Sequence, residues 1–347
     1  MKALQLTDWK HEPELREVPE PDPGPGQLVI EVGGSGACHS DLHLIHDFDA
    51  GLLPYELPFT LGHENAGWIH GLGDGVDGLE VGEPVAVYGP WGCGRCHRCR
   101  QGMENYCMRQ AEIGAAGGGL GRNGGMARYM LIPDPRLVVP IGDLDPVDAA
   151  PLTDAALTPY HAIKRSLHLL GAGSTTVVIG AGGLGHMAIQ ILRALTGTTV
   201  IAVDQRSEAL AVAAAAGADH TVVSGDSAAE EVLALTKGIG ADVVIDLVGV
   251  DPTLALAASV VRSMGHLSIV GIGGGTIPIG FFSIGYEVSV ATTYWGSIPE
   301  LMDVVALAQS GKIAAEVTRF DLADAPSAYQ QLHAGTLTGR AVIEPKK

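Results

Sequence analysis

The chain has 347 residues, of which 46% are hydrophobic, enough for about two domains with buried cores. Its formal net charge of −18 disfavours binding to nucleic acids or to anionic membrane surfaces, because both are bound through clustered Lys and Arg. We therefore expect neither of them among its partners.

The first twenty residues lack the apolar stretch of a signal peptide, and the longest apolar run, residues 177–192, is interrupted by glycines and polar residues. These features predict a cytoplasmic protein without a membrane span. Four of its five cysteines fall within fifteen residues. In a reducing compartment this clustering indicates a metal site or catalysis rather than disulfides.

Residues 1 to about 155 are rich in Pro and Gly and contain short strand-like runs, such as residues 27–32 and 84–88. This pattern predicts a mostly β domain. Cys38 and His63 within it are candidate ligands of a catalytic zinc, which needs three protein ligands and an open fourth position. Taken singly, a Cys or a His is more often a buried structural residue.

Four cysteines follow with the spacing C-x2-C-x2-C-x7-C, namely Cys93, Cys96, Cys99 and Cys107. Four thiolates complete a tetrahedral zinc shell and leave no open position, so we expect a structural zinc lobe over about residues 91–110. A [4Fe–4S] cluster is the main alternative. The ferredoxin run, however, has its fourth Cys after three residues, followed by Pro.

From about residue 175, apolar strands alternate with helical segments, as is typical of βαβ units on a parallel sheet. The expected strands are residues 176–179, 199–203, 220–223, 242–246 and 267–271. Between the first two strands, apolar residues recur with a helical period from Leu184 to Leu195. We expect one face of this helix to pack on the sheet.

The loop between the first strand and this helix has the pattern G-x-G-x-x-G. Its first glycine permits a tight turn, the second lets a pyrophosphate approach the backbone, and the third lets the helix pack closely on the strand. A phosphate would then lie at the helix N-terminus. The residues predicted to bind the dinucleotide here are Gly180, Gly182, Gly183, Leu184 and Gly185.

Asp204 ends the next predicted strand, where a carboxylate can accept hydrogen bonds from the adenosine ribose. This position favours NAD over NADP, because a 2′-phosphate would meet the negative charge. Arg206, two residues later, could serve a 2′-phosphate and keeps NADP as an alternative.

After about residue 295, a predicted helix over Pro299–Ser310 and a strand over Arg340–Glu344 are too short to fold alone. We expect them to join the first domain. The predicted fold is thus α/β, with a doubly wound Rossmann domain over residues 156–294 inserted between residues 1–155 and 295–347 of a β-rich catalytic domain. An edge strand near residues 288–292 is expected to pair across a two-fold axis.

The motifs and their order resemble the zinc-containing medium-chain alcohol dehydrogenases, and most closely the bacterial NAD-dependent secondary alcohol dehydrogenases. The resemblance covers essentially the whole chain. It rests on Cys38-His-Ser-Asp-Leu-His43, Gly62-His-Glu64, the four-cysteine lobe, the Gly-Ala-Gly-Gly-Leu-Gly loop, the Tyr88-Gly-Pro-Trp-Gly-Cys93 lead-in and the segment 151–160. It implies a GroES-like catalytic domain, NAD, and two zinc ions per subunit, one catalytic and one structural.

The resemblance also implies that Asp154 is the third ligand of the catalytic zinc, at a position where the family often has Cys. Both residues bind as anions, so the departure is chemically coherent. Glu64 would lie beside the ligands. Ser40 would pass the alcohol proton, by way of the cofactor ribose, to His43, a position that is apolar in some bacterial relatives.

The resemblance further places Thr158 near the nicotinamide and Arg340 at the pyrophosphate. Without it, Arg340 would be an ordinary charge at an exposed strand end. The implied substrate pocket is apolar and consists of Tyr55, Leu120, Phe282, Tyr294 and Trp295. Aromatic residues at these places could equally belong to a core or a subunit interface.

These inferences predict reversible hydride transfer between secondary alcohols, alkyl or aryl, and NAD, giving ketones. A polyol or diol dehydrogenase on the same fold is the alternative, disfavoured by the apolar pocket. A zinc-free quinone reductase of the same superfamily is disfavoured by the full sets of zinc ligands. A non-catalytic NAD-binding structural protein would have no reason to retain Cys38, Ser40, His63 and Asp154 together. The family's bacterial members imply a homo-oligomer, a tetramer rather than a dimer.

Overall fold

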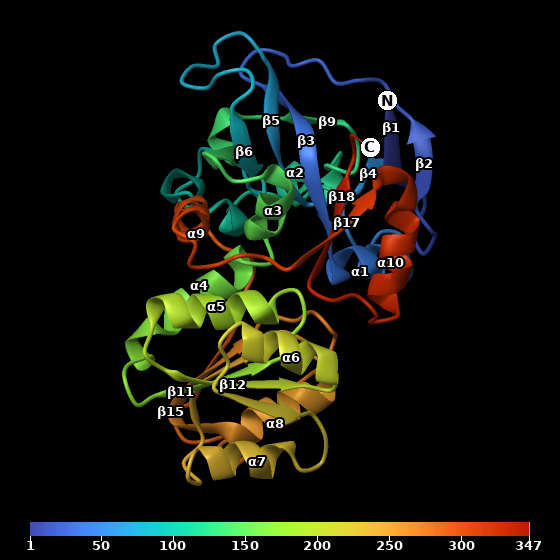
Figure 1. Cartoon of the computed structure of the whole chain (residues 1–347). Coiled ribbons are helices and arrows are strands. Elements are labelled where there is room, and N and C mark those ends of the chain that lie inside the picture. Colours follow the sequence, from blue (N-terminus) through green and yellow to red (C-terminus); the bar gives the residue numbers. More distant parts are fainter. Residues whose placement is uncertain (347) are drawn as a thin grey trace. The chain divides into compact units, whose positions relative to one another are not determined.

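A computed structural model describes residues 1–346, which form two compact units (Figure 1). Unit 1 contains Met1–Asp154, Gly296–Gly311 and the chain from Ala315 onward, and unit 2 contains Ala155–Trp295 and Lys312–Ala314. The predicted α/β fold class is confirmed, because unit 1 is rich in β-structure and unit 2 is built on a parallel sheet.

Unit 1 is organised around a seven-stranded sheet with the order β10-β6-β5-β3-β18-β17, in which β9 also pairs with β3. The last strand of the chain runs antiparallel to β3, so the C-terminal strand joins this core as expected. The strands are β3 (Leu28–Ala37), β5 (Glu64–Leu72), β6 (Pro84–Val87), β9 (Tyr129–Ile132), β10 (Val138–Pro140), β17 (Val317–Asp321) and β18 (Arg340–Glu344).

Strand β3 continues five residues beyond the predicted end at residue 32. Its glycines resemble turn signals, but they allow close packing. A Cβ on Gly33 would lie 2.7 Å from the Pro146 side chain, and one on Gly34 would lie 2.8 Å from the Val147 backbone. The extended strand brings Cys38 to the end of β3.

Smaller elements complete unit 1. A three-stranded sheet has the order β2-β1-β4, and β7 pairs with β8. These strands are β1 (Lys2–Leu6), β2 (Glu14–Glu17), β4 (Phe59–Thr60), β7 (Gly117–Gly118) and β8 (Gly121–Arg122). The helices are α1 (His39–His46), α2 (Gln110–Ile113), α3 (Pro146–Ala149), α9 (Ile298–Gln309) and α10 (Ala325–His333), with 3₁₀ turns at Cys99–Gln101, Glu104–Tyr106, Pro135–Leu137, Ala150–Thr153 and Leu322–Asp324.

Unit 2 is a six-stranded parallel sheet with the order β13-β12-β11-β14-β15-β16. Helices α5 and α6 cover one face of this sheet, and α7 and α8 cover the other (Figure 1). The strands are β11 (Thr175–Ile179), β12 (Thr199–Asp204), β13 (His220–Val223), β14 (Ala241–Asp246), β15 (Val261–Ile269) and β16 (Ser289–Thr292). The helices are α4 (Leu157–Ser166), α5 (Gly185–Leu195), α6 (Ser207–Ala215), α7 (Ala228–Leu235) and α8 (Asp251–Val260), with a 3₁₀ turn at Leu167–Leu169.

The prediction of a strand over residues 267–271 was wrong at both ends. Strand β15 begins at Val261, because α8 runs directly into it, and it ends at Ile269. The next two residues turn away from the ladder, and the N–H groups of Val270 and Gly271 both donate to the carbonyl of Asp246.

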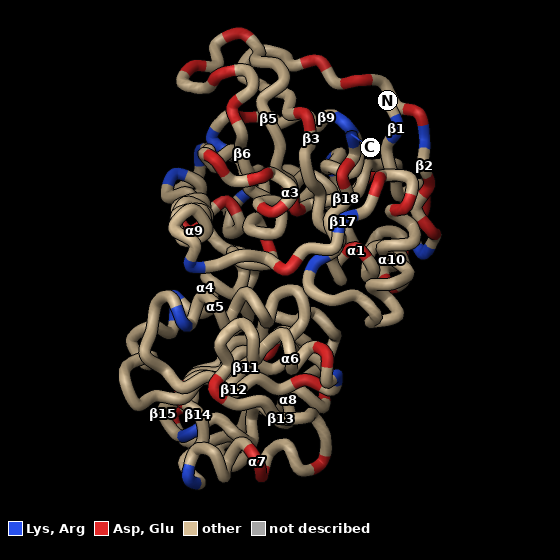
Figure 2. The backbone as a smooth tube through the Cα atoms, viewed as in Figure 1, with Lys and Arg blue, Asp and Glu red and all other residues tan. Residues whose placement is uncertain are grey.

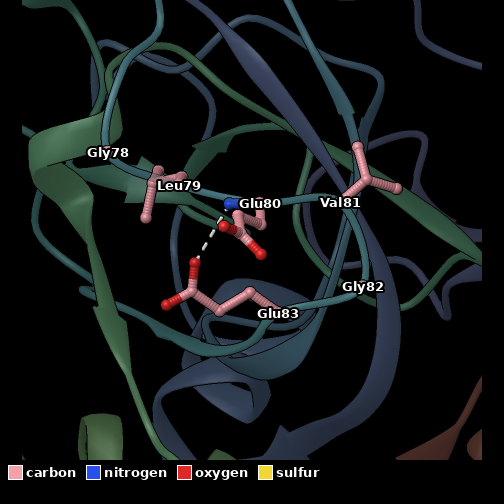
Figure 3. Close-up of a pocket in the computed structure, with 6 residues that line it drawn as sticks. All are labelled: Gly78, Leu79, Glu80, Val81, Gly82 and Glu83. Carbon is pink, nitrogen blue, oxygen red and sulfur yellow. Dashed lines mark hydrogen bonds between the residues drawn. The ribbon is translucent and has the colours of Figure 1, made fainter.

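Acidic residues are spread over the surface of both units (Figure 2). A hollow in the loop between β5 and β6 is lined by residues 78–83, and the Glu83 carboxylate there accepts the Glu80 N–H (Figure 3). This hollow contains none of the residues predicted for the zinc, cofactor or substrate sites. Within residues 1–346, no helix has both the length and the apolar character needed to cross a bilayer.

Candidate active site and metal centres

Four potential ligands gather in the interior of unit 1. Donor atoms of Cys38, His63, Glu64 and Asp154 all lie within 4.8 Å of one another, and all four residues are buried. Cys38 lies between the end of β3 and the start of α1. His63 immediately precedes β5, Glu64 is the first residue of that strand, and Asp154 follows the 3₁₀ turn Ala150–Thr153.

The spacing of the three predicted ligands fits a zinc ion. The Cys38 Sγ atom lies 3.8 Å from Asp154 Oδ2, and His63 Nε2 lies 3.6 Å from the same oxygen. Tetrahedral zinc holds its N, O and S ligands at about 2.0–2.3 Å, which places the ligand atoms roughly 3.3–3.8 Å apart. Cys38, His63 and Asp154 can therefore hold one zinc ion together.

Asp41 supports two of these ligands, and the sequence reasoning missed it. Its Oδ2 accepts the backbone N–H of Cys38 at 3.0 Å, and its Oδ1 lies 3.0 Å from His63 Nδ1. With Nδ1 engaged in this way, Nε2 of His63 faces the cluster. The sequence contains one indication of this role. Asp41 is the third residue of α1, and an acidic residue at that position commonly accepts a hydrogen bond from the N-cap backbone.

Charge around His63 favours its protonated form in the metal-free protein. Burial opposes ionisation, but the charge of Asp41 and hydrogen bonds to Asp154 and Asp41 raise the pKa of His63 well above its ordinary range. A metal ion must displace this proton, so metal binding at the cluster releases protons.

Arg340 is buried, with only 3% of its surface exposed, and it pairs with Glu64. Its Nε donates to Glu64 Oε2 at 2.8 Å, its Nη2 contacts Oε1, and the same Nη2 lies 3.8 Å from Asp154 Oδ2. Burial raises the pKa of Glu64 to about 7, and the charge of Arg340 opposes this rise. A Cβ on Gly36 would lie 2.0 Å from Glu64 Oε2, so the pair needs a glycine in β3.

The two predicted proton-relay residues lie on α1. The Ser40 hydroxyl is 3.1 Å from His63 Nε2, which places it at the ligand cluster. His43 is half-buried, and its Nδ1 lies 2.5 Å from Asp47 Oδ2. Because Ser40 and His43 are three residues apart on a helix, their side chains share one face.

The four-cysteine lobe forms a second candidate metal centre. The sulfur atoms of Cys93, Cys96, Cys99 and Cys107 all lie within 4.8 Å of one another. The Cys96–Cys99 distance is 3.4 Å and the Cys93–Cys99 distance is 4.0 Å. Zinc–thiolate bonds of about 2.3 Å place tetrahedral sulfurs roughly 3.8 Å apart, so the lobe fits a zinc ion.

The surroundings of these thiols change their pKa values in opposite directions. The N–H groups of Cys99 and Met108 point at the Cys96 sulfur and lower the pKa of Cys96 to about 6. Burial has the opposite effect on Cys99 and raises its pKa. Next to the thiols, the buried Glu104 carboxylate accepts the Nε–H of Arg136 at 3.0 Å.

The glycine-rich loop of unit 2 has the geometry expected for a dinucleotide. Gly180 has φ +89°, and a Cβ on Gly185 would lie 2.1 Å from the Gly180 carbonyl, so both positions need glycine. A Cβ on Gly182 would meet only Arg206 Nη2, at 3.9 Å, which leaves the backbone open to a ligand. Gly183 and Leu184 lead into α5, with Leu184 as its N-cap.

Asp204 ends β12 as predicted and faces this loop. Its Oδ2 accepts the Ala181 N–H at 2.8 Å, and its Oδ1 accepts the Arg206 N–H at 2.9 Å. These bonds fix a carboxylate beside the loop, where the adenosine ribose of a dinucleotide would lie. Thr158, predicted near the nicotinamide, is buried in α4 of the same unit.

The structure does not gather the five predicted pocket residues in one unit. Tyr55 and Leu120 belong to unit 1, where burial raises the pKa of Tyr55 and the charge of His63 opposes the rise. Phe282, Tyr294 and Trp295 belong to unit 2. Phe282 is 89% exposed there and Trp295 is buried.

Comparison with known proteins assigns both parts of the chain. Residues 24–143 match the model of the alcohol dehydrogenase GroES-like domain, and residues 183–310 match that of the zinc-binding dehydrogenases. The chain is 36% identical to an NAD-dependent alcohol dehydrogenase of Sulfurisphaera tokodaii, over 99% of this chain and 100% of that protein.

Two further relatives are named for the substrates on which they act. A D-arabinose 1-dehydrogenase (NADP(+)) of Saccharolobus solfataricus is 34% identical over 99% of this chain and 97% of its own. The structure of an acetophenone reductase from Geotrichum candidum in complex with NAD is 30% identical, with a TM-score of 0.86 over 99% of this chain and 96% of that chain.

Proposed function

Because the chain belongs to the zinc-dependent medium-chain alcohol dehydrogenase family, we propose that it interconverts secondary alcohols, alkyl or aryl, and ketones with NAD as the hydride carrier. The buried cluster of Cys38, His63 and Asp154, with spacing that suits one zinc ion, carries this proposal. A relative named acetophenone reductase supports aryl ketones as substrates.

The protein groups around the zinc site have distinct tasks. When bound, zinc supplies Lewis acidity to the alcohol oxygen and NAD accepts the hydride. Cys38 and Asp154 contribute two negative charges and His63 a neutral imidazole, which together balance the charge of a divalent cation. Asp41 holds the His63 ring by its Nδ1–H, so that the Nε2 lone pair is directed at the ligand cluster.

Ser40 and His43 provide the path for the alcohol proton. The Ser40 hydroxyl lies at the ligand cluster, where it can accept the proton of the substrate while it donates its own. His43 follows on the same face of α1, and its hydrogen bond to Asp47 through Nδ1 keeps Nε2 as the basic nitrogen. Because the side chain of His43 is 25% exposed, it can release the proton to solvent.

The first experiment follows absorbance at 340 nm with NAD and 1-phenylethanol, before and after zinc is removed by a chelator. The proposal expects a rate that the chelator abolishes and that added zinc restores. D-arabinose with NAD and with NADP forms the parallel arm, because a relative named for that sugar makes sugar oxidation the second candidate. A folded, zinc-loaded protein active only on the sugar would refute the secondary-alcohol proposal.

We also propose that the chain forms a homotetramer in the cytoplasm. Strand β16 is an open edge of the unit 2 sheet, and Phe281, Phe282 and Tyr286 form an exposed aromatic cluster in the same unit. An open strand edge and an exposed apolar patch are features that proteins usually cover with a partner.

The proposed cytoplasmic location is supported by the cysteines. All five cysteines are free thiols, which agrees with a reducing compartment.

A further inference from the structure

We propose that Tyr329, in the C-terminal helix α10, is a positioning residue for the catalytic zinc site and acts through Asp41. The inference rests on the proposed function, in that it takes Cys38 and His63 as zinc ligands. It adds a residue that lies 288 positions from Asp41 in the sequence.

The contact between the two side chains is direct and buried. The phenolic O–H of Tyr329 donates to Asp41 Oδ2 at 3.0 Å, and the phenolic oxygen also lies 3.3 Å from Met126 Sδ. Tyr329 is 2% exposed and Asp41 is fully buried. Burial and the neighbouring charge of Asp41 raise the pKa of Tyr329 well above its ordinary range, so the phenol keeps the proton that it donates.

The phenol completes a set of three donors around one carboxylate. Oδ2 of Asp41 accepts from the Cys38 N–H and from Tyr329, while Oδ1 bonds to His63 Nδ1. Two of these three groups belong to zinc ligands, so the orientation of the carboxylate sets both the Cys38 backbone and the His63 ring. Tyr329 is the donor that fixes this orientation without itself belonging to a ligand.

Removing the phenolic oxygen would loosen this arrangement selectively. Tyr329→Phe fills nearly the same volume, so packing of α10 is retained, but Oδ2 keeps a single donor inside the protein. The carboxylate can then rotate, and the His63 ring loses part of its support. Loss of an outer-shell partner of a zinc-bound histidine typically weakens metal binding 10–100-fold, and we expect roughly tenfold here because Tyr329 acts one step further out.

The test measures zinc release from the intact holoenzyme to a chromogenic chelator, which separates a catalytic-site phase from a lobe phase. Cys38→Ala, which lacks a catalytic ligand, identifies the lobe phase. Tyr329→Phe is expected to accelerate the catalytic-site phase roughly tenfold and to leave the lobe phase unchanged. The matched control is Tyr88→Phe, which removes another buried phenol, bonded to the Gly296 carbonyl at 2.5 Å, and should leave the catalytic-site phase unchanged.

A double-mutant cycle shows whether Tyr329 acts through Asp41. On an Asp41→Asn background, adding Tyr329→Phe should change catalytic-site release less than about twofold, since coupled residues are not additive. Unaltered release in the single variant, equal acceleration of both phases, or full additivity would each overturn the proposal. A wild-type protein holding zinc only in the lobe would refute the zinc assignment itself, whereas two zinc ions without alcohol oxidation would refute the proposed reaction alone.

Discussion

Asp154 is the proposed zinc ligand whose residue type departs from the Cys often found in the family, and its charge is the property that matters. We expect Asp154→Asn to lose the catalytic zinc and to lower kcat by more than about 100-fold, since even outer-shell changes cost 10–100-fold. Asp154→Cys restores an anionic ligand and should retain both zinc ions, with kcat within about tenfold of wild type. Metal content per subunit and initial rates measure both effects.

The control for this pair is Asp148→Asn, which removes an exposed carboxylate that lies 2.8 Å from Arg319 in the same unit. It should leave zinc content and kcat unchanged. If Asp154→Asn kept two zinc ions and the wild-type rate, Asp154 would not be a ligand.

Cys96 should be the most reactive thiol of the lobe once zinc is removed. Backbone N–H donors lower its pKa to about 6, so its thiolate is populated above that pH and lost as pH falls through it. We expect alkylation of Cys96 in the zinc-stripped protein to rise with pH around a midpoint near 6. Mass spectrometry of the modified peptides distinguishes alkylation of Cys96 from alkylation of Cys99. Burial raises the pKa of Cys99, so its alkylation should require a higher pH. A Cys96 midpoint near that of a free thiol would contradict the structure.

Some residue roles could be predicted from the sequence, and others depend on contacts that only the fold creates. The four cysteines of the lobe lie within fifteen residues, so their metal-binding pattern could be recognised from the sequence alone. The assignments of Asp154 and Arg340 came from family resemblance. The pairing of Arg340 with Glu64 joins residues 276 positions apart, and no local pattern distinguishes this buried arginine from an exposed strand end.

At the scale of elements, one arginine ties the four-cysteine lobe to the 3₁₀ turn that precedes β10. Arg136 donates to the buried Glu104 at 3.0 Å and to the Gly92 carbonyl at 3.0 Å. Removing one partner of a fully buried ion pair lowers the free energy of unfolding by about 3–5 kcal/mol. Because Arg136 is partly exposed, we expect Arg136→Met to lower it by about 1–3 kcal/mol. Thermal unfolding of the zinc-loaded protein should show the lower Tm.

Arg128→Met provides the comparison, because it removes an exposed pair with Glu31 and should shift Tm much less. Equal shifts for the two variants would mean that the Arg136 contact does not stabilise the lobe.

Elements with strong periodicity were predicted within a residue or two, and the remaining errors have both local and long-range causes. Helix α9 begins at Ile298, one residue before the predicted start, because Ser297 and Glu300 form a capping box. The end of β3 was missed because Gly33 and Gly34 serve close packing with α3, a need that depends on an element more than one hundred residues away. Glycine signals a turn or a close approach equally well, and only the packing decides between them.

At the scale of the whole molecule, two features of unit 2 favour self-association while net charge opposes it. The exposed ring of Phe281 contacts those of Phe282 and Tyr286 at 4.9 and 5.4 Å between centroids, and β16 leaves one edge of the sheet open. A charge of −18 on every copy adds repulsion that salt screens over about 8–10 Å. Assembly should therefore strengthen as ionic strength rises from low salt to physiological values.

Phe282→Asp tests whether the aromatic cluster is the assembly surface. Phe282 is 89% exposed, so the substitution should leave the subunit folded, but it places a charge within the proposed contact surface. We expect light scattering to show a tetramer for the wild type and smaller species for the variant, with the difference largest at low salt. Leu52→Asp, at an exposed site in unit 1, is the control that should remain tetrameric. A variant that assembles like the wild type would place the interface elsewhere, and a monomeric wild type would refute the tetramer itself.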